Sequence, residues 1–72
     1  MELYEFNRLN ERMLKGEMIE FENESDVLLA SFNRGFYTFS INAKHWLRQK
    51  SFRTFRDKLV KKVEELNLKL SN

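Results

Sequence analysis

Cysteine and proline are absent from this 72-residue chain, and histidine occurs only once, at His45. Without cysteine the chain can form neither a disulfide nor a thiolate metal site, and one histidine cannot form a histidine cluster. We therefore predict that the protein binds no metal ion and no other cofactor. The lack of cysteine also agrees with a reducing compartment, so we expect a cytoplasmic location.

Long apolar segments are missing as well. The longest aliphatic run, Val27–Ala30, is far too short to cross a bilayer, and the acidic N-terminal residues do not resemble a secretory signal. We therefore expect no membrane partner. Only two glycines are present, and the sequence contains no glycine-rich phosphate loop or dinucleotide fingerprint. No small-molecule substrate is evident.

Catalytic groupings are equally sparse. Glu20 and Glu22 would project from one face of a strand, but paired carboxylates act as acid and base only within a cleft that raises the pKa of one of them. A domain of this length offers little cleft, and His45 has no evident serine or aspartate partner. The sequence predicts a non-enzymatic protein.

The hydrophobic residues, 42% of the chain, are arranged for a single α+β domain over residues 1–72. Apolar residues at spacings of three and four predict a helix over 2–14, with Gly16 as its C-terminal cap. The spacing then changes to two, which is typical of strands joined by short turns into an antiparallel meander. The three predicted strands cover residues 17–22, 26–32 and 36–41.

Residues 42–51 permit two interpretations. Asn42 is of a type that caps helices, and a short helix there would carry Trp46 and Leu47. The same residues also suit an extension of the third strand or a fourth strand. We favour the helix.

A longer C-terminal helix is predicted around Thr54, where the residues up to Asp57 resemble a capping box. Its apolar stripe would run as far as Leu70. The predicted order is α-β-β-β-α, a three-stranded meander with the N- and C-terminal helices packed on one face of the sheet.

Charge is divided unevenly along the chain. Residues 1–26 carry eight acids and three bases, whereas residues 27–72 carry ten bases and three acids, giving net charges of −5 and +7. Such an asymmetry is typical of a charged binding surface. Because lysine and arginine neutralise phosphates, the leading hypothesis is a regulatory protein that binds nucleic acid through its basic C-terminal half. The candidate contacts are Arg34, Lys44, Arg48, Lys50, Arg53 and Arg56.

Aromatic residues are interleaved with these bases. Exposed aromatic rings can stack on nucleobases, but a small core needs its large side chains, so we expect Trp46, Phe52 and Phe55 to be buried. Phe36 is the exception, because it lies on the otherwise polar face of the third predicted strand. We expect it to contact a helix or a partner.

The acidic half leaves two further hypotheses open. One is a protein-binding inhibitor or adaptor that docks through charge complementarity, and the other is a homodimer in which acidic and basic surfaces pair. A further interpretation needs no partner: the acidic residues would prevent an edge strand from pairing with a strand of another molecule. The candidate acidic partner surface comprises Glu17, Glu20, Glu22 and Glu24.

In general character the chain resembles small proteins of phages and mobile elements of low-GC bacteria. The resemblance lies in segment 15–21, the meander and the helix entry at 51–55. It implies an accessory role, such as DNA binding, regulation or inhibition of a host protein.

Overall fold

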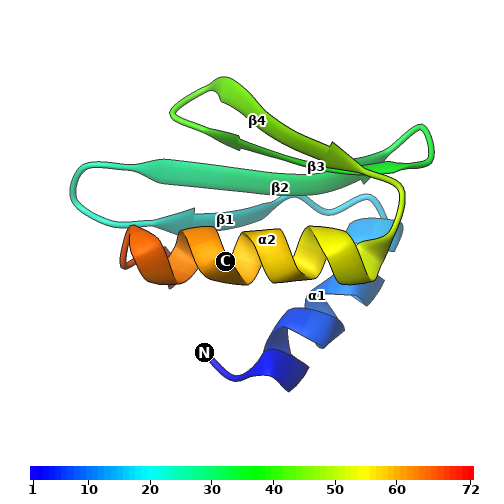
Figure 1. Ribbon diagram of the computed structural model, residues 1–72, viewed down its shortest axis with the longest axis horizontal. Helices are drawn as coiled ribbons and strands as arrows, with labels where there is room; N and C mark the ends of the chain where they lie inside the picture. The colour runs from blue at the N-terminus through cyan, green and yellow to red at the C-terminus, as the bar shows by residue number, and fades with distance from the viewer.

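A computed structural model describes all 72 residues of the chain. Two helices pack on one face of a five-stranded antiparallel sheet (Figure 1). The strands lie in the order β4-β3-β2-β1-β5. The predicted α+β class, with both helices on one face, is confirmed, but the sheet has two more strands than expected. The elements are α1 (Leu3–Leu14), β1 (Ile19–Glu22), β2 (Val27–Asn33), β3 (Phe36–Ile41), β4 (Lys44–Gln49), α2 (Phe52–Glu65) and β5 (Lys69–Leu70).

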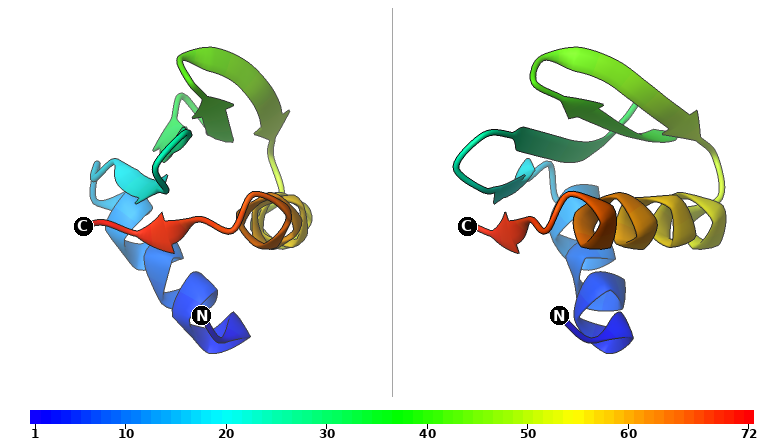
Figure 2. Two further views of the ribbon diagram at one scale, coloured as in Figure 1. Left: turned by 90° about the vertical axis from the view of Figure 1, so that its left-hand side faces the viewer. Right: turned by 60° about the vertical axis from the view of Figure 1, so that its left-hand side comes forward.

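The helices cover the sheet in one layer and leave its other face open, as the end-on view of α2 in Figure 2 shows. Neither helix is long and apolar enough to cross a membrane. Each helix contributes three buried side chains, as their three-to-four spacing predicts: Phe6, Leu9 and Met13 from α1, and Phe55, Leu59 and Val63 from α2.

Alternating residues of the strands complete the core. Phe55 has no exposed surface, and its ring lies 5.4 Å from that of Tyr37 and 5.8 Å from that of Phe39. The Tyr37 hydroxyl donates a hydrogen bond of 2.6 Å to Asn10 Oδ1. Burial raises the pKa of this hydroxyl, because an apolar environment disfavours the charged phenolate. Phe52 is partly buried and packs against the core, so the prediction of buried aromatics is confirmed for Phe55 and only in part for Phe52.

The helix favoured over 42–51 is wrong and the alternative of a fourth strand is confirmed, because this segment forms a hairpin and the strand β4. Asn42 and Ala43 both have positive φ, 53° and 67°, which is the geometry of a two-residue type I′ turn. The Asn42 side chain accepts a hydrogen bond from Val27 N and donates one to Asp26 Oδ1. Asn42 therefore connects the β3–β4 turn to the start of β2 by hydrogen bonds and caps no helix.

The C-terminal helix also differs from the prediction at both ends. It begins after Ser51, whose Oγ accepts a hydrogen bond from Thr54 N, so Thr54 is not the cap. It ends at Glu65, and Asn67, with φ 55°, turns the chain back toward the sheet. Leu70 consequently lies in β5, opposite Phe21 of β1, and not on the helix.

Candidate nucleic-acid interface

Four of the six candidate basic residues gather at one end of the molecule. Arg34 lies in the β2–β3 turn, and the β3–β4 register places Arg48 opposite Thr38, close to that turn. The chain then passes from β4 into α2 at the same end (Figure 1). We call this surface the basic end, and it comprises Arg34, Arg48, Lys50 and Arg53.

Side chains of the basic end are exposed, and none of them takes part in the three ion pairs of the structure. Exposed cations without acidic partners keep their full attraction for an external anion. The N-terminus of α2 lies at this end as well, and the helix macrodipole adds a partial positive charge there.

Phe36 organises two of these cations. Arg48 Cζ lies 3.8 Å from the centroid of the Phe36 ring, and Lys50 Nζ lies 5.5 Å from it. Both distances are within the range of a cation–π interaction. The contact explains why a phenylalanine occupies the polar face of β3, and it holds two positive charges side by side.

Arg34 adopts a backbone conformation that its residue type disfavours. Its φ is 54° and that of Gly35 is 84°, as a type I′ turn requires. Asparagine, aspartate and glycine tolerate this conformation best, and other residues adopt it at an energetic cost. The side chain points to solvent from the tip of a hairpin, where it packs against no core residue.

The other two basic candidates lie elsewhere. The Arg56 guanidinium is 3.0 Å from both Asp57 Oδ1 and Asn7 Oδ1, and only 17% of its side chain is exposed. Arg56 therefore connects α2 to α1. Lys44 opens β4 beside the β3–β4 turn, at the opposite end of the molecule from Arg53.

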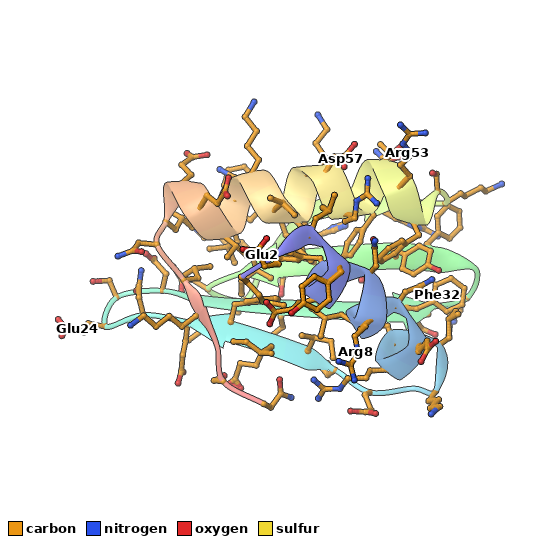
Figure 3. All side chains as sticks on the ribbon, turned by 90° about the horizontal axis from the view of Figure 1, so that it is seen from below. Glu2, Arg8, Glu24, Phe32, Arg53 and Asp57 are labelled. Carbon is orange, nitrogen blue, oxygen red and sulfur yellow. The ribbon has the colours of Figure 1, made fainter.

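Acidic residues gather at that opposite end. The β1–β2 turn lies beside the end of α2, where Asn23 Nδ2 donates a hydrogen bond of 2.7 Å to the carbonyl oxygen of Leu66. Figure 3 shows Glu24 and Arg53 at opposite ends of the molecule. We call this surface the acidic end. It comprises Glu22, Glu24, Asp26, Glu64 and Glu65, with Lys44, Lys69 and Lys62, the ion-pair partner of Glu65, as nearby bases.

The two remaining acidic candidates are separate from this end. Glu17 follows α1 and forms an ion pair of 2.9 Å with Arg12. Glu20 lies within β1 on the open face of the sheet. Because β1 pairs with β2 on one side and with β5 on the other, it is an interior strand, and edge protection does not explain its acids.

Trp46 was expected in the core, yet 53% of it is exposed. It lies at an irregularity of the β3–β4 ladder, where Phe39 pairs with Leu47 and Ser40 with His45. Trp46 is therefore the unpaired residue of a β-bulge, a feature that redirects side chains. No periodicity in the sequence reveals such an insertion.

His45 is exposed on β4, and no three His, Asp or Glu side chains lie close enough together to share a metal ion. Comparison of the chain with protein-family models, with curated proteins and with solved structures finds no match. The function proposed below therefore depends on the geometry and charge of the molecule itself.

Proposed function

We propose that this chain is a non-enzymatic regulatory protein of the cytoplasm that binds nucleic acid through its basic end. The observation that carries the proposal is the convergence of four exposed, unpaired cations from a hairpin turn, an edge strand and a helix start. Phosphates are spaced regularly along a nucleic acid, so clustered lysine and arginine side chains match its backbone.

The backbone of Arg34 supports the same function. An unfavourable φ persists where the surrounding structure enforces it, and such positions concentrate at functional sites. Asparagine at this position would give a more stable hairpin, so the presence of arginine is consistent with use of its guanidinium.

The proposal is tested with the double variant Arg34→Asn/Arg53→Gln. We expect weaker binding to duplex DNA and RNA at low salt. A plot of log K, where K is the association constant, against log salt concentration has a negative slope. This slope should become shallower by about 0.9 for each phosphate of duplex DNA that the variant no longer neutralises. Fluorescence anisotropy of a labelled duplex across a salt series measures both quantities.

The matched control is Lys44→Gln/Lys69→Gln, which removes the same charge from the opposite end. This control should bind almost as tightly as the unaltered protein. The proposal fails if the unaltered protein has no affinity for DNA or RNA at low salt, or if added salt does not weaken binding. Equal losses of affinity in the two double variants would also contradict it, because net charge alone would then account for binding.

The acidic end favours a second candidate function, an inhibitor or adaptor that docks on a basic surface of another protein. A hollow of ≈ 730 Å³ lies at this end between the β1–β2 turn and the segment after α2, with Glu22, Glu24 and Asn67 among its lining residues. Nucleic-acid binding gives this surface no role. Retention of one specific protein from a nuclease-treated lysate, and its loss in Glu22→Lys/Glu24→Lys, would support the second function over the first.

A further inference from the structure

A second basic surface lies apart from the basic end, in a groove between β4 and α2. Its volume is ≈ 330 Å³. Trp46 and Leu47 line it from the strand, and Phe39 contributes a buried side chain at its floor. Both Trp46 and Leu47 reach this side of the sheet because the bulge interrupts the alternation of β4.

The groove combines an aromatic ring with positive charge. Lys58, Lys61 and Lys62 line it from α2, where spacings of three and four place them on one face of the helix. The single acid of the groove, Glu65, lies 3.6 Å from Lys62 Nζ. An anionic occupant is therefore favoured over a neutral or cationic one.

The indole of Trp46 indicates what kind of anion fits. Lys62 Nζ lies 4.0 Å from the centroid of the Trp46 ring, so the lysine positions the ring while half of it stays open to solvent. A large aromatic surface left exposed beside lysines is the combination with which proteins bind single strands: bases stack on the ring and phosphates meet the cations. In a duplex the bases already stack on one another and are not available.

We propose that the groove between β4 and α2 is a single-strand site, in which a nucleobase stacks on Trp46 and the neighbouring phosphates contact Lys58 and Lys61. This inference rests on the proposed nucleic-acid function and specifies single-stranded DNA or RNA as the ligand of the groove. The groove and the basic end share β4 and α2, so one strand can contact both surfaces.

Trp46 is the only tryptophan of the chain, so its fluorescence reports on the groove directly. We expect an oligothymidylate to quench this fluorescence at low salt. An abasic oligomer of the same length carries the same phosphates without bases, and it should bind more weakly and quench little. Duplex DNA should bind at the basic end and leave the fluorescence almost unchanged.

A variant series separates stacking from charge. Trp46→Leu should weaken oligothymidylate binding, measured by anisotropy of a labelled oligomer, by about 5- to 150-fold. It should leave duplex binding unchanged. Trp46→Phe keeps an aromatic ring and should retain part of the affinity. Because Trp46 is half exposed, we expect both variants to fold, and their thermal unfolding provides the check.

Several results would overturn the inference. Oligothymidylate binding that neither quenches Trp46 nor depends on it would place the strand elsewhere, while the proposed function would stand. Equal quenching by the abasic oligomer or by polyglutamate would show that the groove responds to charge and not to bases. Absence of any binding to single strands and duplexes at low salt would instead remove the proposed function itself.

Discussion

At the scale of single residues, two hairpin positions adopt a backbone conformation that their residue types disfavour. Arg34 and Ala43 both have positive φ in two-residue turns. The guanidinium of Arg34 reaches solvent at the basic end, where it is available to a ligand. Ala43 has only a methyl group and offers no comparable contact, so nothing in the structure compensates the free-energy cost of its positive φ.

We predict that Ala43→Gly stabilises the protein by about 1 kcal/mol, because glycine adopts a positive φ without the clash of a Cβ atom. Chemical denaturation monitored by circular dichroism measures the change. The reciprocal control is Gly35→Ala in the other hairpin. No atom lies within 4 Å of the added Cβ, so the decrease in stability there reflects backbone conformation alone. A destabilised Ala43→Gly variant would contradict the turn geometry.

At the scale of helices and strands, the sequence predicted what regular spacing encodes. The stripe of α1 and the alternation in β2 and β3 match the buried residues of the structure, because each element turns one face to the core. The sequence left β4 undecided between a helix and a strand, because its bulge breaks the alternation at Trp46 and because Asn42 occurs in turns as readily as at helix caps. β5 has two residues, too few for any period.

The candidate site was predictable only in part, for the same reason. The sequence identified Arg34, Arg48, Lys50 and Arg53 by charge. Their convergence depends on the β3–β4 register, which places Arg48 opposite Thr38 and beside Phe36. Arg56 has the same residue type as Arg53, yet its contact with Asn7 of α1 is a tertiary interaction that spacing does not reveal.

The start of α2 gives a prediction at this scale. Ser51→Ala removes the side-chain acceptor for Thr54 N and should cost about 1 kcal/mol of stability. Thr54→Ala leaves that backbone N–H in place and should cost much less. Thermal unfolding of the two variants distinguishes the observed cap from the one that the sequence predicted: a larger decrease in stability in Thr54→Ala would place the helix start at Thr54.

At the scale of the whole molecule, the division of charge along the chain becomes a division in space. The basic and acidic ends lie at opposite ends of a body whose longest extent is 31 Å. Electrostatic screening acts over about 30 Å in 0.01 M salt but only about 8 Å in 0.15 M salt. At low salt the basic end of one molecule therefore attracts the acidic end of another.

We predict self-association that is head-to-tail, so that it extends in chains and does not close as a symmetric dimer would. Light scattering at 0.01 M salt should show an apparent mass that rises with protein concentration and returns to the monomer value at 0.15 M. Glu22→Gln/Glu24→Gln should weaken the effect by removing charge from the acidic end. A monomer at low salt and high concentration would exclude this association.

The pairing of β5 with β1 has a consequence for the order of folding. Phe21 lies opposite Leu70, far along the chain, whereas β1 to β4 follow one another through short turns. Closing a long loop costs more conformational entropy than closing a hairpin, so we expect the hairpins to form first and β5 to join last. β5 has only two residues, and beyond it only Ser71 and Asn72 bind the chain to the β1 side, through hydrogen bonds with Glu20 and Met18, so we expect this edge of the sheet to open first. The sheet would thus form first among β1 to β4 and open first at β5, the edge next to the acidic end.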